Sequence, residues 1–223
     1  MNSLILGNAL IDLFVHGGPI MYPILLTAIA AVAVVGERLV WWILHSRRRT
    51  PKVLAQLLAT LEKGDLSRAI VVSGGSPDPS VKMVHQGLKG YPTSLSESMT
   101  VVAIDEVQKS GRFIPVMDTL ITLAPLLGLL GTVTGIMGSF SSIGGSELAV
   151  EKVTGGIGEA LIATAAGLGI AICVLLPYNW CNRRSSDLAT ELQKIGSHVE
   201  GLMKRVNPTA SVGHPSSASA DNK

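Results

Sequence analysis

Two long apolar stretches without a charged residue constrain this chain more than any other feature. They are Thr119–Phe140 and Ala160–Trp180. A hydrocarbon layer about 30 Å thick is crossed by roughly 20 apolar residues in a helix, and both stretches reach that length. With 47% hydrophobic and only 15% charged residues, the composition is typical of an integral membrane protein. The sequence therefore predicts two transmembrane helices and argues against a soluble fold.

A third apolar segment precedes these two. Residues 20–36 carry no charge, an adjacent pair of opposite charges, Glu37 and Arg38, interrupts the segment, and residues 39–44 resume it with two tryptophans. Tryptophan rings are typical of the membrane interface. Because adjacent residues point apart on a helix, we expect Glu37 and Arg38 to act as separate anchors that extend toward water rather than as a buried pair.

The positions of lysine and arginine predict the orientation of the chain. Of the eighteen such residues, ten lie between residues 45 and 112 and six lie after Trp180, whereas residues 1–19 have none and residues 141–158 have only Lys152. Positive residues that flank spans are retained on the cytoplasmic side. We therefore expect an all-α membrane protein with three transmembrane helices, an outer amino terminus and an inner carboxyl terminus. The distribution of these charges reports the topology, and the net charge of +2 gives no sign of nucleic acid as a partner.

The segment between the first two spans contains signals for short helices. Thr50 before Pro51 predicts the start of one helix, Asp65 can cap a second, and a Gly- and Pro-rich break precedes a third over 80–89. Ser94 followed by Glu97 fits a capping box.

The helix that begins after Ser94 is predicted to be unusually long. No strong breaker lies before Gly111, so it can continue to Phe140 as a rod of about 69 Å.

The third span is also expected to extend into the cytoplasm. Apolar residues recur three and four apart between Leu188 and Val206, and they predict a seam that packs either on a partner helix or on the chain's own inner helices. Residues 207–223 are rich in Ser, Ala and Pro and are expected to be disordered.

Small residues predict a tight contact between the second and third spans. Lipid offers no hydrophobic reward for helix association, so close approach over small side chains must supply the stability. Their spacing of three and four places them on one face of each helix. The predicted packing residues are Gly128, Gly131, Gly135 and Gly138 of the second span and Ala163, Gly167 and Ala171 of the third.

Pro125 and several threonines could place polar groups within these spans. Pro125 removes a backbone donor and leaves the carbonyl of Ile121 without its helical partner, so a bend is expected there. Thr132 and Thr164 can bond back to a carbonyl one turn earlier or can face water. Spacing alone leaves both options open.

Glu159 is the strongest candidate for a functional group. If the third helix begins near Leu148, this carboxyl lies about 15 Å inside it, where a charge must be protonated, paired or hydrated. If the helix begins near Gly156, Glu159 is an ordinary acid of a first turn. Asp118 can be a second ionisable station or a solvated residue at the membrane edge.

Two motifs resemble a known family. Leu123–Met137 (LAPLLGLLGTVTGIM) closely resembles the signature of the ExbB/TolQ/MotA family of inner-membrane proton-channel subunits, and Gly156–Leu168 (GIGEALIATAAGL) is similar to the matching stretch of its third helix. Gly17–Pro23 and Glu37–Leu39 are similar to the ExbB branch. The resemblance covers all three spans.

This resemblance implies a function that composition and spacing do not show. It implies a homopentamer whose second and third helices surround a pore, an ExbD-like single-span dimer in that pore, and a TonB-like protein that is driven by the proton motive force. By motif position, Thr132, Glu159 and Thr164 would line the pore beside an aspartate of the partner. On a helical wheel Glu159 and Thr164 are about 140° apart, so a single shared stripe is not assured.

The complete expectation is a multi-pass protein of the bacterial inner membrane without a cofactor or metal. A TolQ-like subunit of an envelope-maintenance motor and a non-conducting scaffold are the alternatives. An enzyme is not expected, because no constellation of catalytic residues is present. The expected segments are a periplasmic stretch with an interfacial helix or frayed end (1–18), spans at 19–44, 113–140 and 157–181, a cytoplasmic helical domain (45–112), a periplasmic loop (141–156), a cytoplasmic helix (182–206) and a tail (207–223).

Overall fold

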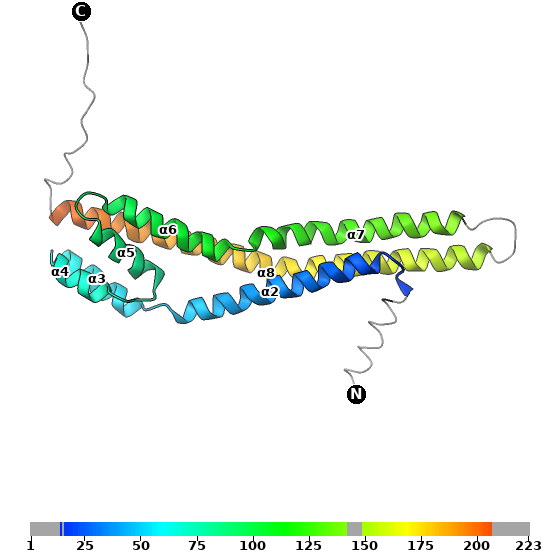
Figure 1. Ribbon diagram of the computed structural model, residues 1–223, viewed down its shortest axis with the longest axis horizontal. Helices are drawn as coiled ribbons and strands as arrows, with labels where there is room; N and C mark the ends of the chain where they lie inside the picture. Colours follow the sequence, from blue (N-terminus) through cyan, green and yellow to red (C-terminus); the bar gives the residue numbers. More distant parts are fainter. Residues whose placement is uncertain (1–13, 15, 142–148, 207–223) are drawn as a thin grey trace, which may run out of the picture. The chain divides into compact units, whose positions relative to one another are not determined.

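The computed structural model describes residue 14 and residues 16–141 and 149–206. Every regular element in these ranges is a helix, and three helical stretches are long and apolar enough to cross a membrane. The predicted all-α membrane fold is therefore confirmed. The tail and most of the 1–18 segment lie outside the described residues. The helices in Figure 1 are α2 (Met21–Arg47), α3 (Pro51–Glu62), α4 (Leu66–Ser73), α5 (Pro79–Lys89), α6 (Leu95–Gly111), α7 (Ile114–Ser141) and α8 (Ala149–Val206).

The helices form two compact units. The membrane unit comprises the described residues of Met1–Trp42 together with Gly111–Arg183, and the extramembrane unit comprises Ile43–Ser110 together with the described residues of Arg184–Lys223. Helices α2 and α8 each contribute to both units. The expected cytoplasmic domain at 45–112 thus includes the C-terminal part of α8 as well.

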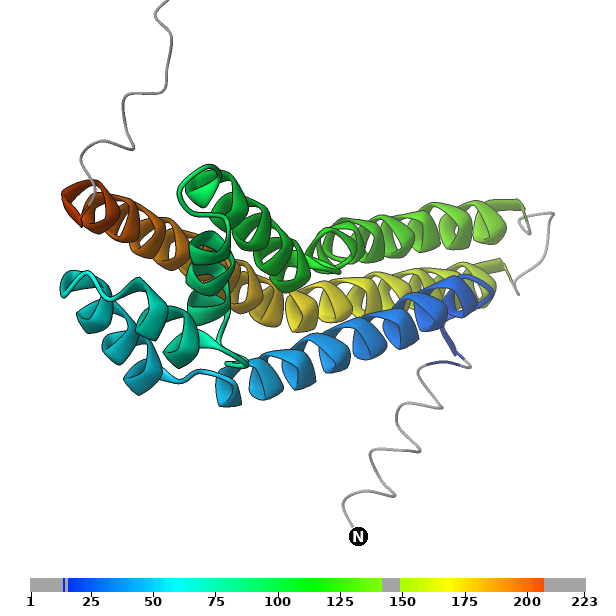
Figure 2. The same cartoon turned by 60° about the vertical axis from the view of Figure 1, so that its left-hand side comes forward.

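In the membrane unit, α2 and α7 both lie along α8 (Figures 1 and 2). Apolar side chains on the outward faces remain exposed; Leu26 and Leu176, for example, are each 71% exposed. A large exposed apolar surface marks contact with lipid or with another protein chain. One cluster of buried side chains joins all three helices and consists of Ala31, Met117, Leu120 and Val174.

Arg38 is the main departure from the expected arrangement of α2. Its side chain is 1% exposed, its Nε and Nη2 donate to the two carboxylate oxygens of Glu37 at 2.5 and 2.8 Å, and its guanidinium carbon lies 5.0 Å from the ring centroid of Trp41 and 5.6 Å from that of Phe113. The prediction of two separate anchors is wrong. A guanidinium fork can turn back onto a neighbouring carboxylate, and aromatic faces cover a cation favourably.

The predicted continuous rod from Leu95 to Phe140 is also wrong, because the helix breaks at residues 112 and 113. Helix α6 ends at Gly111, α7 begins at Ile114, and Phe113 has a φ of +67°, in the left-handed region. Pro115 supplies a reason that the sequence analysis overlooked. Without an N–H it cannot donate to the carbonyl of Gly111, and its ring would clash in a continuing helix.

Helix α8 begins earlier than the expected third span. It starts at Ala149, so residues 149–156 of the expected loop at 141–156 are helical. The expected segments at 157–181 and 182–206 belong to this same helix, which continues through Pro177. Close packing against α7 explains why glycine occupies position 156 of this helix. A Cβ at Gly156 would overlap the hydroxyl oxygen of Ser139 on α7.

The seam on the C-terminal part of α8 packs on the chain's own helices. Leu188 and Leu192 are each 1% exposed, and Val199 is fully buried. Of the two options for the predicted seam, the structure therefore supports packing within the chain. The buried core of the extramembrane unit consists of Leu57, Leu61, Ala69, Val81, Met83, Val84, Leu88, Met99, Leu188, Leu192, Val199, Leu202 and Met203.

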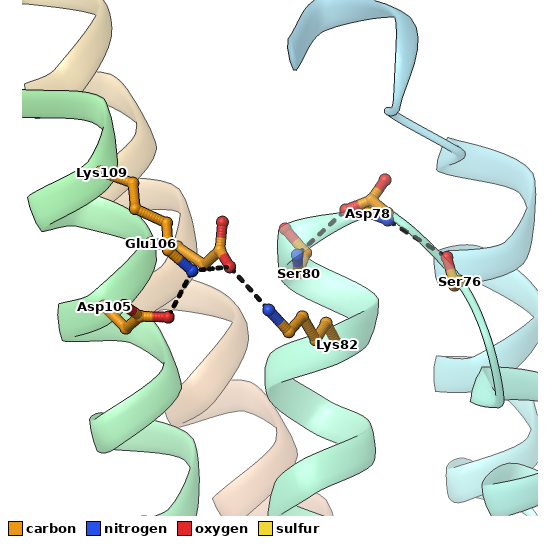
Figure 3. Close-up of polar contacts among 7 residues, drawn as sticks. All are labelled: Ser76, Asp78, Ser80, Lys82, Asp105, Glu106 and Lys109. Carbon is orange, nitrogen blue, oxygen red and sulfur yellow. Dashed lines mark hydrogen bonds and ion pairs between the residues drawn. The ribbon is translucent and has the colours of Figure 1, made fainter.

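Two aspartates cap the short helices of this unit. Asp65 accepts a hydrogen bond from the backbone N–H of Arg68 at 2.9 Å, as predicted for α4. Asp78 accepts from the backbone N–H of Ser80 at 3.0 Å and thereby caps α5 (Figure 3). Each carboxylate satisfies a donor that the first turn of a helix leaves free.

Two predicted caps are used differently. Thr50 precedes α3, but its hydroxyl lies 3.2 Å from that of Ser76 and its backbone N–H donates to Asp78 at 2.6 Å. Ser94 precedes α6, but its hydroxyl donates to the carbonyl of Gly90 at 3.3 Å rather than forming the expected capping box. Thr50 therefore bonds to residues distant in the sequence, and Ser94 bonds to a carbonyl of the preceding turn, instead of capping the helices that follow them.

Helices α5 and α6 are joined by a polar cluster around Glu106 (Figure 3). The Glu106 side chain is 11% exposed, and its Oε1 lies 2.9 Å from Nζ of Lys82 and 3.5 Å from Nζ of Lys109. Lys109 also pairs with Asp105 at 2.6 Å. Because the carboxylate of Glu106 is largely buried, the two lysine ammonium groups are needed to offset the cost of removing its charge from water.

We expect Leu192→Ala to destabilise the extramembrane unit by about 2–5 kcal/mol, because it removes a buried side chain and leaves a cavity. Val71, which is 78% exposed, provides the matched control, and Val71→Ala should change little. Amide hydrogen exchange in α3 and α5 of the full-length protein would measure both effects. Unchanged protection in the Leu192 variant would contradict the assignment of this seam to the chain's own core.

Candidate functional site

Helices α7 and α8 approach each other closely over glycine. A Cβ at Gly128 would lie 2.9 Å from Cα of Thr164, and a Cβ at Gly131 would lie 2.6 Å from Cβ of Ala163. Both distances are too short for ordinary side-chain contact. The absence of a side chain on these glycines is therefore what permits the contact between the two helices.

The same close contact, which we call the glycine seam, continues in both directions. A Cβ at Gly167 would overlap the carbonyl oxygen of Ala124, and a Cβ at Gly135 would lie 3.1 Å from Cβ of Ala160. Gly138, in contrast, has no neighbouring atom within 4 Å of an added Cβ. The Cβ position of Gly138 therefore points away from the contact, although α7 and α8 still meet one residue further on, where Gly156 packs against Ser139.

Beyond the seam, a cleft of about 680 Å³ opens between α7, α8 and the start of α2. The side chains of Thr134, Ser139 and Glu159 provide polar groups, and the glycines expose their backbone. The cleft thus introduces polar atoms into a bundle whose outer surface is apolar. Its lining consists of Pro19, Ile20, Gly131, Thr134, Gly135, Gly138, Ser139, Gly155, Gly156 and Glu159.

Glu159 is the ionisable group of this cleft. It lies about 15 Å along the axis from the first residue of α8, Ala149, as in the first of the two predicted alternatives. Its side chain is half-buried and rests against the turn before α2, where a Cβ at Gly18 would overlap the carboxyl group. Among the residues that the structure describes, none donates a hydrogen bond to this carboxylate.

The other two predicted pore residues do not join Glu159 in the cleft. Thr132 donates to the carbonyl of Leu129 at 2.7 Å, which is the back-bonding option. Thr164 instead donates across the seam to the carbonyl of Gly128 at 2.9 Å, so its hydroxyl ties α8 to α7. The hydroxyl that does lie in the cleft belongs to Thr134, which bonds back to Leu130 at 2.9 Å.

Pro125 and Asp118 occupy other parts of α7. Pro125 lies inside the helix, which continues to Ser141, and the bend expected at Pro125 stays a prediction. Asp118 is exposed near the start of α7 and is separate from the cleft. The described site therefore has a single carboxyl group.

This arrangement suits the transfer of small charged species rather than bond-making chemistry. A carboxyl without an internal donor can bind and release a proton, and nearby hydroxyls can orient water. In the described ranges no group of three or more histidine, cysteine, aspartate or glutamate side chains could hold a metal ion. An intramembrane acid is by default a functional group of an ion pathway.

Comparison with known proteins agrees with this geometry. Residues 76–194 match the MotA/TolQ/ExbB proton channel family. The chain is 32% identical to the biopolymer transport protein ExbB-like 1 of Synechocystis sp. over 88% of this chain and 80% of that protein. It is 49% identical to the biopolymer transport protein ExbB of Neisseria gonorrhoeae over 37% of this chain and 39% of that protein. It is 31% identical to the Tol-Pal system protein TolQ of Pseudomonas aeruginosa over 63% of this chain and 69% of that protein.

The three long apolar helices define a membrane protein, and the family that matches its sequence is one of proton-channel subunits. The chain belongs to the MotA/TolQ/ExbB proton channel family, as its motifs indicate. Names of the ExbB type are the most frequent among its relatives. Members of this family act in complexes with partner proteins.

Sequence reasoning missed two contributions to the site. Gly18 was noted only as part of a resemblance, although two glycines before a proline at the start of a span already suggest a turn with a close backbone approach. Gly156 and Ala160 extend the predicted small-residue face of α8 with the same spacing of four and three. That periodicity could have identified both residues.

We predict that Gly128→Ala destabilises the membrane unit, whereas Gly138→Ala does not. The added methyl group at Gly128 meets the backbone of α8, which cannot move without separating the helices, but the same group at Gly138 meets open space. Thermal unfolding of the full-length protein in detergent would compare the two variants. Equal melting temperatures would contradict the assignment of Gly128 to the seam.

Proposed function

We propose that this chain is an ExbB-like subunit of an inner-membrane motor that is driven by the proton motive force. In this proposal, a partner with a single membrane span and its own acidic residue completes the proton path, and the complex energises a TonB-like protein for transport across the outer membrane. The observation that carries the proposal is Glu159, a half-buried carboxyl in a polar cleft at the N-terminal end of the third span, without a described hydrogen-bond donor.

The need for a partner follows from what the chain supplies by itself. Its apolar stretches from Thr119 to Phe140 and from Ala160 to Trp180 contain no acid, so Glu159 stands at the end of a span rather than in its middle. A continuous proton relay requires further groups that can accept and donate a proton along the way. A second ionisable group from another chain would meet that requirement.

The free energy released per proton favours a mechanism that adds together several proton transfers. One proton that moves through 100 mV releases about 2.3 kcal/mol, and each pH unit adds about 1.4 kcal/mol. Conformational work on another protein therefore requires several protons. A ring of rigid helical subunits around a partner suits this task, and the chain supplies long helices and a glycine seam that fixes two of them together.

The same proposal assigns the cellular setting. The chain would lie in the bacterial inner membrane as a multi-pass protein, with its amino terminus in the periplasm and its carboxyl terminus in the cytoplasm, because its positive charges follow the first and third spans. The extramembrane unit, which contains most of these charges, would then lie in the cytoplasm.

We expect Glu159→Gln to slow proton uptake by at least about tenfold, because an amide cannot bind and release a proton at this point of the path. The complex would be purified with its native partner and reconstituted into vesicles that contain a pH-sensitive dye, and a potassium gradient with valinomycin would drive uptake. Glu62→Gln, which changes an exposed acid of α3, is the matched control. Thr132→Val should also slow uptake, but by a smaller factor, because Thr132 bonds back to Leu129 and does not line the cleft.

An unchanged rate in an assembled Glu159→Gln complex would overturn the proposed function and would leave the non-conducting scaffold. Assembly would be checked by co-purification of the partner. This control separates loss of conduction from loss of the complex.

We expect the intact protein to form a homopentamer, since a ring is needed to enclose a path around a partner. Native mass spectrometry from mild detergent would measure the mass of the oligomer directly. A monomer or a tetramer as the dominant species would contradict this part of the proposal.

A TolQ-like role in envelope maintenance is the second candidate. It is favoured by the similarity to the TolQ protein of Pseudomonas aeruginosa. The two roles differ in the partner protein that the motor drives. Deletion of the gene would cause loss of energised uptake across the outer membrane in the first case, and leakage of periplasmic proteins with sensitivity to detergents in the second.

A further inference from the structure

The start of α2 contributes to the Glu159 site in a way that the family motifs of α7 and α8 do not indicate. The backbone N–H of Met21 donates to the carbonyl of Gly18 at 3.0 Å, and the N–H of Tyr22 donates to that of Pro19 at 3.3 Å. These bonds attach the turn firmly to the first turn of α2. Gly18 has a φ of +68°, which favours glycine.

Two independent features require glycine at position 18. The positive φ would strain any other residue, and an added Cβ would occupy the volume that the Glu159 carboxyl fills. The second feature concerns Glu159 alone, because the nearest three atoms to that Cβ all belong to its side chain. The carboxyl therefore rests directly on the backbone of Gly18.

We infer that Gly18 is a positioning residue that seats the Glu159 carboxyl in the cleft between α7 and α8. The backbone of the turn closes one side of the carboxyl, so the group faces the lining that contains Thr134 and Ser139. Helix α2 thereby contributes to the proton path as well as to the lipid-facing surface. This inference rests on the proposed function for its consequence, but the contact itself can be tested without any activity.

The chain offers a matched control for backbone strain. Gly75 has a φ of +72°, close to that of Gly18, but an added Cβ there meets no atom within 4 Å. Gly75→Ala therefore reports the cost of the positive φ alone, whereas Gly18→Ala adds the overlap with Glu159. The difference between the two variants isolates the contact.

The first experiment is a double-mutant cycle on thermal stability of the full-length protein in detergent. We expect Gly18→Ala to lower the melting temperature more than Gly75→Ala does, and we expect Glu159→Ala to remove that excess by vacating the overlapped volume. Gly75→Ala and Glu159→Ala should be additive. Additive effects of Gly18→Ala and Glu159→Ala would overturn the inference.

The second experiment tests the consequence by rescue in the reconstituted complex. Gly18→Ala should slow proton uptake by at least about tenfold, because a displaced carboxyl no longer faces the cleft. Glu159→Asp shortens the side chain by one methylene and makes room for the methyl group, so Gly18→Ala with Glu159→Asp should conduct faster than Gly18→Ala alone. A merely structural role of the turn predicts no such rescue, and its absence would overturn the inference.

The outcomes separate this inference from the proposed function. If Glu159→Gln leaves proton uptake unchanged, the proposed function fails, while the stability cycle still decides the contact between Gly18 and Glu159. If Glu159→Gln stops uptake but the cycle is additive, the positioning role of Gly18 fails and the proposed function stands.

Discussion

The close approach of α7 and α8 over glycine is the constraint on which the rest of the membrane unit depends. In water, burial of large apolar side chains would hold such helices together, but in lipid the surroundings are as apolar as the side chains themselves. Gly128 and Gly131 let the backbone of α8 come into direct contact, and the Thr164 hydroxyl adds a bond across the seam to the Gly128 carbonyl. The polar cleft lies directly beyond this contact, so its walls are fixed by the same packing.

The charged groups of the membrane unit follow two different rules. Arg38 is buried, yet it is neutralised by Glu37 and covered by Trp41 and Phe113, so its role in the fold is structural. Glu159 is only half-buried, and no described residue donates a hydrogen bond to it. A buried charge with all its partners stabilises one arrangement, whereas a charge without them is available for function.

Much of the fold could be predicted from periodicity and composition. The three spans, the glycine face of α7 and the apolar seam from Leu188 to Leu202 all follow from spacing, because each uses a regular helical repeat. Periodicity does not reveal the break at Phe113, because Pro115 acts on the helix locally and leaves no mark on the repeat of apolar residues. The burial of Arg38 also escaped prediction, because its aromatic neighbour Phe113 is distant in the sequence.

The candidate site was predictable only in part. Glu159 stands out because an acid beside a long apolar stretch is rare, and the start of α8 at Ala149 decides between its two predicted settings. The surroundings of the carboxyl depend on tertiary placement. Thr164 lies on the expected helix but turns toward α7, and Gly18 comes from the turn before α2, which no spacing rule connects to Glu159.

The half-exposed state of Glu159 has a consequence for the life of the protein in the cell. In a newly inserted copy that diffuses by itself, the exposed part of this carboxyl must be hydrated through the cleft, because acyl chains solvate neither a charge nor an unpaired hydrogen-bonding group. Solitary copies should therefore be less stable than assembled ones, and surplus copies should be removed by proteolysis. Synthesis of the chain in step with its companions would then follow from the chemistry of one side chain.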